Sequence, residues 1–174
     1  MGSVTKIPLP EPGFYRAPQW APDSRKIAFL DNRPRIWWLD VETKKAVQVD
    51  NEPYWTFGGE HAPVWSPDSR WLAYARRLQN YMFAIHLYSV ADGKSTQVTD
   101  GMSDALSARF DKSGKYLYFT ASTDIGPPNG GLDMSSYPLR SRYIIYAVVL
   151  KKTDPSPLAP ESDEEKVAED KKDE

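Results

Sequence analysis

A twelve-residue pattern that recurs at a fixed interval constrains the fold of this chain more than any other feature of its sequence. Trp20, Trp65 and Phe110 occupy the same place in three copies of the pattern, so the period is 45 residues. The copies cover residues 18–29, 63–74 and, in a weaker form, 108–119. A period of about 40 to 45 residues with several short strands per unit is typical of β-propeller blades.

Each unit divides into four short strands separated by turns. The first strand ends at the repeated aromatic residue, and a turn follows in which Pro presets φ and Asp and Ser can bond nearby amides. We expect second strands at 26–30, 71–75 and 116–120, third strands at 36–40, 85–89 and 144–149, and outer strands within 41–49, 90–98 and 150–158.

The predicted second strands are apolar on both faces, as the runs 27–30 and 116–119 show. A strand with one wet face alternates between apolar and polar residues, whereas a strand buried on both faces does not. Sheets stacked face to face supply such two-sided burial. Six Trp, ten Tyr and six Phe also favour strands. An ordinary β-sandwich with accidental similarity between its strands is the alternative.

The sequence therefore predicts an all-β chain of three four-stranded antiparallel blades, about half of a six-bladed propeller. Residues 1–10 form a leading outer strand from a preceding blade, which includes Ile7, Pro8 and Leu9. The other boundaries are 11–50 for blade 1, 51–100 for blade 2, 101–160 for blade 3 with a long insertion at 121–142, and 161–174 for a disordered acidic linker. Because propellers close with about four to eight blades, we expect the partner to be a second copy or the missing blades.

Charge and composition exclude several other classes of partner. Residues 161–174 carry eight acidic residues and three Lys, a balance of -5, so the body of the chain is +3 against the total of -2. That charge is mild and scattered, which argues against a nucleic-acid partner. No run approaches the roughly 18 apolar residues of a membrane span. Without Cys there is neither a disulfide nor a thiolate metal site.

The repeated pattern resembles that of TolB-like propellers and of tricorn-like protease propellers over nearly all of residues 5–158. Ser24 and Ser69 stand where that family usually has Gly. The insertion in the third unit and the segment 155–165 resemble the last blade of the first, N-terminal propeller of bacterial tricorn-like serine proteases. The resemblance implies a periplasmic or cytoplasmic bacterial protein with a second propeller, a PDZ-like module and a serine peptidase domain. None of these later parts lies in this sequence, so no catalytic residue of the family can be assigned to it.

The chain offers little chemistry of its own. It has two His and no Gly-x-Ser-x-Gly nucleophile elbow, and we expect His86 to be a packed strand residue. Residues 126–131 are rich in Gly, but their two Pro remove amide donors that a phosphate loop needs. Asp124 and Asp133 have no fixed separation, so no metal site is predicted. We therefore expect no catalytic residue, no cofactor and no metal.

Strand alternation places the connections after the outer strands and after the second strands on one rim of the ring. Aromatic residues and Arg dominate binding hot spots, so this rim is the predicted surface for a peptide or protein. The residues are Tyr54, Trp55, Phe57, His61, Arg76, Arg77, Tyr81, Arg140 and Arg142. An equally weighted alternative is that they cover the insertion and seal the rim.

The leading hypothesis is a non-catalytic propeller segment that binds peptides or scaffolds a tricorn-like protease, closing a six-bladed ring as a homodimer or with missing blades. The first alternative is a fragment of a TolB-like periplasmic peptide-binding propeller. The second is a propeller-type hydrolase or lyase that uses His61 and nearby acidic residues.

Overall fold

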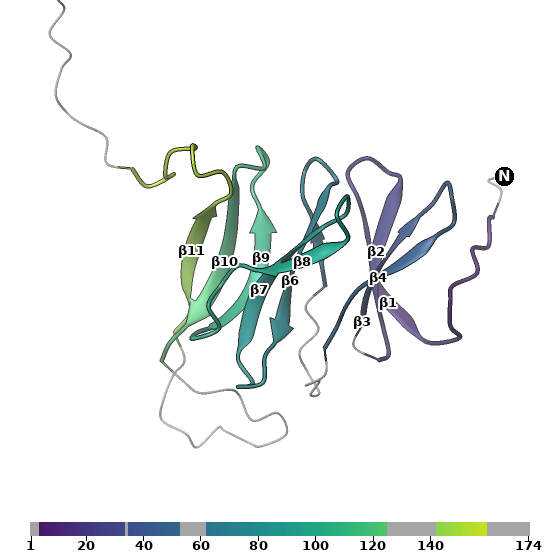
Figure 1. The fold of residues 1–174 in the computed structure, drawn as a ribbon, viewed down its shortest axis with the longest axis horizontal. Helices are drawn as coiled ribbons and strands as arrows, with labels where there is room; N and C mark the ends of the chain where they lie inside the picture. Colours follow the sequence, from purple (N-terminus) through teal and green to yellow (C-terminus); the bar gives the residue numbers. More distant parts are fainter. Residues whose placement is uncertain (1–3, 34, 53–61, 125–141, 160–174) are drawn as a thin grey trace, which may run out of the picture.

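The part of the chain that the structure describes is built from antiparallel strands. The structure is a computed structural model, and it describes residues 4–33, 35–52, 62–124 and 142–159. Within these residues eleven strands form three sheets that lie side by side (Figure 1). The strands are β1 (Tyr15–Trp20), β2 (Lys26–Asp31), β3 (Arg35–Asp40), β4 (Ala46–Asn51), β5 (Val64–Trp65), β6 (Trp71–Arg77), β7 (Phe83–Ser89), β8 (Lys94–Gln97), β9 (Asp104–Phe110), β10 (Tyr116–Ser122) and β11 (Ile144–Val149).

Each sheet follows the chain order of its strands. The first sheet is β1-β2-β3-β4, the second is β5-β6-β7-β8 and the third is β9-β10-β11. The register between the second and third strands is the same in all three sheets, because Phe29 pairs with Trp37, Tyr74 with His86 and Phe119 with Tyr146. The three units are therefore equivalent, which confirms the predicted repeat and the all-β propeller blades.

The turn after the first strand has one backbone conformation in all three units. Ser24 and Ser69 have φ values of 58° and 59°, and Gly114 at the equivalent position has 70°. This left-handed region favours Gly because it has no Cβ. The two Ser residues therefore keep the conformation of the glycine turn, as the resemblance implies.

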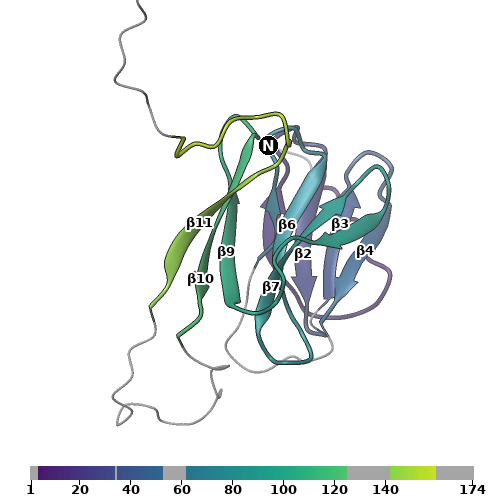
Figure 2. The ribbon, with the colours of Figure 1, turned by 60° about the vertical axis from the view of Figure 1, so that its left-hand side comes forward.

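The third sheet lacks the outer strand predicted within 150–158. Residues 150–159 form turns instead, including one in which the amide of Asp154 donates to the carbonyl of Lys151 at 2.9 Å. In a second turn the amide of Ala159 donates to the carbonyl of Ser156 and the amide of Leu158 to its hydroxyl, both at 3.2 Å, so these amides bond locally and not in a ladder. The prediction of three four-stranded blades is therefore wrong for blade 3, and β11 is an edge strand (Figure 2).

The segment that leads into the first sheet is also not part of a strand. Residues 4–14 carry no strand, so the predicted leading outer strand is not formed as one among the described residues. Ile7 and Leu9 instead pack against Phe29, Trp37 and Leu39 on the outer face of the first sheet.

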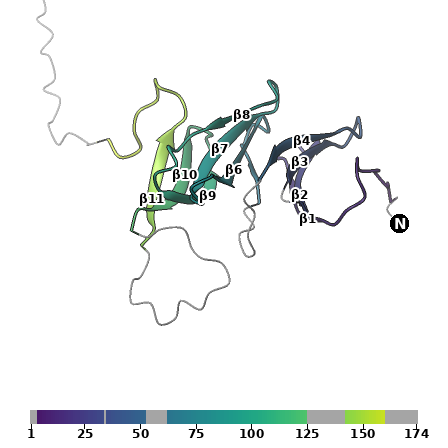
Figure 3. The same cartoon turned by 60° about the horizontal axis from the view of Figure 1, so that its bottom comes forward.

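Two apolar cores lie between neighbouring sheets. Ala28, Leu30 and Ile36 of the first sheet meet Leu72 and Tyr74 of the second. The other core joins the second and third sheets, and its buried residues are Ala73, Ala75, Phe83, Ile85, Ala105, Ala108, Leu117, Phe119 and Ala121. The second sheet is thus covered on both faces, which explains why its strands do not alternate. Figure 3 shows the three sheets in sequence, with the first and third at the two ends of the stack.

Candidate interaction surfaces

The contact between the first and second sheets shows what each unit requires of its neighbour. The indole Nε1 of Trp65 donates to the carbonyl oxygen of Gln19 at 3.0 Å. In the adjacent turns the amide of Asp23 donates to the hydroxyl of Ser69, also at 3.0 Å. Trp65 is only 9% exposed. The equal spacing of the repeat thus brings both the aromatic residue and the turn of one unit onto the preceding unit.

The same residue is uncovered where no preceding sheet is present. Trp20 is the repeat equivalent of Trp65, and 59% of it is exposed. The outer face of the first sheet also has an open cleft of about 240 Å³ beside Ile7, Leu9, Tyr15 and Phe29. This end face therefore carries the residues that form a sheet-to-sheet contact elsewhere in the stack, but no described sheet covers them.

The opposite end of the stack is also apolar and open. On β11 Ile144 is 60% and Ile145 is 72% exposed, and Tyr146 is exposed as well. Ile145 pairs with Thr120, whereas Tyr146 pairs with Phe119 in the core between the second and third sheets. Because neighbouring strand residues point to opposite faces, Ile145 belongs to the face turned away from the second sheet. Both end faces of the stack thus expose an apolar side chain, Trp20 on one and Ile145 on the other.

The positive φ of Ser24 and Ser69 leads to a prediction in which the two residues respond differently to the same substitution. We expect Ser24→Gly to raise the free energy of unfolding by about 0.5 to 1 kcal/mol, because it removes the strain of a side chain at positive φ. Ser69→Gly relieves the same strain but loses the bond from the amide of Asp23, worth about 1 kcal/mol, so we expect little net change. Thermal denaturation of both variants measures the difference, and equal shifts would contradict this account.

A polar cluster joins the first two sheets near their outer strands. The hydroxyl of Tyr74 donates to Asp50 Oδ2 at 2.7 Å and lies 2.5 Å from the hydroxyl of Ser95. His86 stacks on Tyr74 with ring centroids 5.6 Å apart, and its Nδ1 is 3.5 Å from the same Ser95 hydroxyl. Burial raises the pKa of Tyr74 and lowers that of His86. His86 is 5% exposed, so it is a packed strand residue as expected.

The buried imidazole predicts a loss of stability in mild acid. Burial lowers the pKa of His86; nearby Arg76 lowers it further, and Asp50 opposes both. Below about pH 6.5 the unfolded chain therefore binds a proton that the folded chain resists, so the free energy of unfolding falls as the pH drops. We expect the His86→Phe variant, which keeps an aromatic ring stacked on Tyr74, to lose less of its free energy of unfolding between pH 7 and pH 5 than the parent chain does. Urea denaturation at both pH values measures it, and an unchanged slope in the variant would refute the assignment.

Two of the predicted rim residues are engaged in contacts within the stack. Arg77 is 5% exposed, its Nε lies 3.7 Å from Glu52 Oε1, and its guanidinium stacks over the ring of Phe83 at 4.5 Å. Arg76 Nη1 lies 3.5 Å from Asp50 Oδ1, and about a third of its side chain is exposed. Arg77 is therefore not available at the surface in this structure, whereas Arg76 is partly so.

The remaining rim residues divide into two groups. Tyr81 is 48% exposed in the turn between β6 and β7, and Arg142 is exposed just before β11. In Figure 1 the end of β6 and the start of β11 lie at the same lower edge of the stack, as strand alternation predicts. Tyr54, Trp55, Phe57, His61 and Arg140 lie outside the described residues. Peptide binding at this rim stays a prediction.

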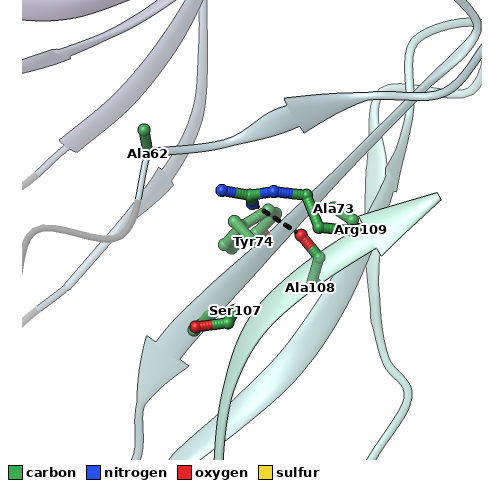
Figure 4. Close-up of a pocket in the computed structure, with 7 residues that line it drawn as sticks. Ala62, Ala73, Tyr74, Ser107, Ala108 and Arg109 are labelled. Carbon is green, nitrogen blue, oxygen red and sulfur yellow. Dashed lines mark hydrogen bonds between the residues drawn. The ribbon is translucent and has the colours of Figure 1, made fainter. Parts of the chain in front are cut away.

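A small cavity lies between the second and third sheets, beside their inner strands (Figure 4). Its volume is about 240 Å³, and its lining residues are Ala62, Ala73, Tyr74, Ala75, Ser107, Ala108 and Arg109. Arg109 supplies the only charge in this lining, and its Nη1 donates to the carbonyl oxygen of Ala108 at 2.8 Å. Sequence reasoning did not find this cavity, because alanine-rich walls carry no chemical motif.

Sequence reasoning also missed an ion-pair cluster at the first end face. Arg35 donates from Nε to Asp31 Oδ2 at 2.7 Å and from Nη1 and Nη2 to the two carboxylate oxygens of Glu11 at 3.2 and 2.8 Å. The indole of Trp37 also donates to Asp31 Oδ2, at 3.1 Å. The hydrogen bonds and the charge of Arg35 lower the pKa of Glu11. The cluster fixes the segment before β1 to the sheet.

A metal-binding cluster and a membrane-spanning helix are both absent from the part of the chain that the structure describes. No group of three or more His, Cys, Asp or Glu residues is arranged there to hold a metal ion. No helix there is long and apolar enough to cross a membrane.

Comparison with known sequences gives one family and one curated relative. A family model described as the tricorn protease second beta propeller domain matches residues 3–174. A tricorn protease homolog of Saccharolobus solfataricus (strain ATCC 35092 / DSM 1617 / JCM 11322 / P2) is 29% identical over 116 residues, which are 63% of this chain and 10% of that protein. The chain thus spans about a tenth of the length of this relative. The matching model describes the second propeller, whereas the sequence resemblance pointed to the first.

Solved structures show the same architecture. The crystal structure of the tricorn protease superposes with a TM-score of 0.64 at 20% identity, covering 82% of this chain and 14% of that one. TolB from Acinetobacter baumannii gives a TM-score of 0.54 at 23% identity, over 82% of this chain and 31% of that chain. At these identities the likeness is one of fold, and it agrees with the three equivalent sheets described above.

Proposed function

The chain belongs to the family of the tricorn protease second β-propeller domain, and on this premise we propose that it is a non-catalytic scaffolding section of a tricorn-like protease. In this proposal its two end sheets are contact surfaces for neighbouring propeller blades. The observation that carries the proposal is the contrast between Trp65, which is 9% exposed against the first sheet, and its repeat equivalent Trp20, which is 59% exposed.

The energetics of the end faces support this proposal. Burying apolar surface contributes about 25 cal/mol per Å², so an exposed Trp and an exposed Ile favour association. Contiguous apolar patches on soluble proteins commonly mark interaction sites. Trp20 at one end and Ile145 at the other are exposed residues of this kind. Each end face of the stack therefore offers a surface of the kind that already joins the sheets within it.

Ring closure by six blades is the form of assembly that we propose. Propellers close with about four to eight blades, and the described chain forms three sheets that do not close on themselves. Three further sheets, from a second copy or from other parts of a longer protein, would complete such a ring. In the proposed assembly the section positions other domains and guides peptides along the rim that holds Arg76, Tyr81 and Arg142.

Mass in solution tests the proposal. We expect the chain to exceed its 19.8 kDa monomer mass in light scattering at micromolar concentrations, and Trp20→Asp or Ile145→Asp to return it to the monomer. Met102→Asp is the matched control, because Met102 is 77% exposed in the connection between β8 and β9 and lies on neither end sheet. A chain that stays monomeric and binds no hydrophobic dye would refute the contact role of the end faces.

Activity and peptide binding need a separate test. The non-catalytic part of the proposal rests on the sequence, which has no nucleophile elbow beside its two His. We expect the isolated chain to hydrolyse no peptide substrate, and activity abolished by His61→Ala would favour the propeller-type hydrolase instead. Capture of immobilised peptides by the chain, reduced by Trp55→Ala or Tyr81→Ala and unchanged by Met102→Asp, would support the rim as the binding surface.

A further inference from the structure

A groove opens between the second and third sheets, at the edge of the stack where each first strand turns into the second. Its volume is about 380 Å³, within the range of about 300 to 1,000 Å³ that is typical of binding pockets. Its apolar lining comes from both sheets and includes Trp71, Leu87, Phe110 and Leu150. In Figure 1 this is the upper edge, to which residues 150–159 belong, opposite the rim that holds Tyr81.

Three smaller side chains account for the groove. Each stands where a larger side chain fills the equivalent place between the first and second sheets, and the three pairs are Trp65 and Phe110, Ser69 and Gly114, and Trp38 and Leu87. The last two are equivalent because they pair with residues 28 and 73, which are one period apart. Trp38 and Trp65 pack into the core between the first two sheets. The same contact between the second and third sheets therefore leaves space.

The turns on the two sides of the groove also lack a hydrogen bond. Between the first and second sheets the amide of Asp23 donates to the hydroxyl of Ser69 at 3.0 Å. Asp68 is the repeat equivalent of Asp23, but Gly114 has no hydroxyl that could accept its amide. The groove thus offers a backbone donor without the acceptor that its counterpart has.

Two side chains at the groove differ in chemistry from their counterparts in the preceding unit. Trp71 stands at the repeat position of Lys26 and is 38% exposed, so its indole is partly open. Lys151 has the repeat position of Ala91, because the residue before each donates its amide to the first turn of its own sheet. The groove therefore combines an accessible aromatic wall with an added positive charge.

Cations line the groove from both sheets. Arg70 belongs to the first turn of the second sheet, and Lys151 follows the last strand of the third. Among the described lining residues the one carboxylate is that of Asp68, which already accepts from Arg70 Nε at 2.9 Å and from the hydroxyl of Ser66 at 2.6 Å. None of the ion pairs between described residues includes Lys151. The lining thus has a net positive charge and favours an acidic occupant.

We propose that this groove binds an acidic peptide segment of a partner protein, in which one bulky apolar residue lies between two acidic residues. The apolar side chain enters beside Trp71, Phe110 and Leu150, and its burial supplies most of the affinity. The flanking carboxylates meet Arg70 on one side and Lys151 on the other, which fixes the register of the peptide. A small acid with a single carboxylate could meet only one of these cations. The site lies on neither end face, so it goes beyond the contact role proposed above.

Fluorescence anisotropy of a labelled hexapeptide with one Leu between Glu residues tests the site. We expect saturable binding to the chain, weaker by about two- to fivefold in Lys151→Ala, which removes one exposed ion pair. Phe110→Trp, which introduces the residue of the second unit, should fill the groove and weaken binding by at least about tenfold. Lys45→Ala is the matched control, because Lys45 is exposed in the turn between β3 and β4 and does not line the groove.

Changes in the peptide test the same chemistry from the other side. Replacing its Leu with Ala should weaken binding by at least about tenfold, because little apolar surface is then buried. Replacing its Glu residues with Lys should abolish binding, since like charges then face each other. Binding of the original peptide should also weaken as NaCl is raised from 50 to 500 mM, because salt screens exposed charges.

The outcomes separate this inference from the proposed function. No saturable binding, or binding that neither Lys151→Ala nor Phe110→Trp weakens, overturns the groove as the site. If the peptide binds only after residues 161–174 are removed, the acidic segment of the chain itself occupies the groove and the partner is wrong. Tyr81→Ala on the opposite rim and Trp20→Asp on the first end face should bind the peptide as the parent does, so the rim and end-face proposals stand or fall by their own tests.

Discussion

Replacing Trp65 with alanine is expected to lower the free energy of unfolding by about 3 to 5 kcal/mol, the range for a buried large aromatic residue. Trp65 packs in the core between the first two sheets, and its indole N–H donates to the carbonyl of Gln19. Its removal leaves a cavity and an acceptor without its donor. Chemical denaturation monitored by circular dichroism measures the change.

Trp20→Ala is the matched control, because it makes the same substitution at the equivalent place of the repeat. Since 59% of Trp20 is exposed, we expect a change below about 1 kcal/mol in a solution dilute enough to keep the chain monomeric. At concentrations where the chain associates, the same variant should be less stable than the parent, because association adds to stability by mass action. Equal losses for the two variants in dilute solution would contradict the difference in burial.

Asp104→Ala is expected to destabilise the chain by about 2 to 3 kcal/mol. Asp104 is 1% exposed, and its carboxylate accepts the amide of Phe83 at 3.0 Å and the hydroxyl of Tyr143 at 2.8 Å. Its removal leaves the buried amide of Phe83 without an acceptor, and hydrogen bonds to a charged group are worth about 1.5 to 3 kcal/mol. Burial and the Asp104 carboxylate raise the pKa of Tyr143 to about 12.

Asp100→Ala provides the comparison for Asp104. Asp100 is exposed and accepts only the nearby amide of Met102, at 2.9 Å, so its loss should cost less than about 0.5 kcal/mol. Urea denaturation of both variants gives the two values. In addition, the absorbance titration of Tyr143 should move to lower pH in Asp104→Ala, because the carboxylate that opposes its ionisation is gone. A titration midpoint that does not move would show that the Asp104 carboxylate does not affect the ionisation of Tyr143.

The repeat predicted the sheets because local signals and the period agreed. Turn chemistry at Ser24 and Ser69 and the apolar second strands placed β2, β6 and β10 within two residues of the expected bounds. The outer strand at 150–158 was predicted from spacing alone, and it failed because the amides of Asp154 and Ala159 bond within local turns instead of to β11. A period therefore predicts where a strand could lie, but the residues at that place decide whether it pairs.

The surfaces were less predictable, because their partners are distant in sequence. Arg77 was expected at the rim on composition, but Glu52 and Phe83 hold it inside the stack. The ion pairs of Arg35 with Asp31 and Glu11 depend on where the segment before β1 folds back. No local motif encodes such pairings. In contrast, the open end faces could be predicted from the sequence, because three units are fewer than a closed propeller needs. Trp20 marks one of these faces, because it has the repeat position of the buried Trp65.

The contact between the first and second sheets and the contact between the second and third use different hydrogen bonds, which fixes the order of the units. Trp65 hydrogen-bonds to the unit before it, but Phe110 at the same position has no N–H, and the third unit instead reaches back through the carboxylate of Asp104. The second and third units therefore bond to the preceding unit through different groups. Excising the middle unit would leave Asp104 without the amide of Phe83 and the carbonyl of Gln19 without the indole of Trp65, so the three units are not interchangeable despite their common backbone.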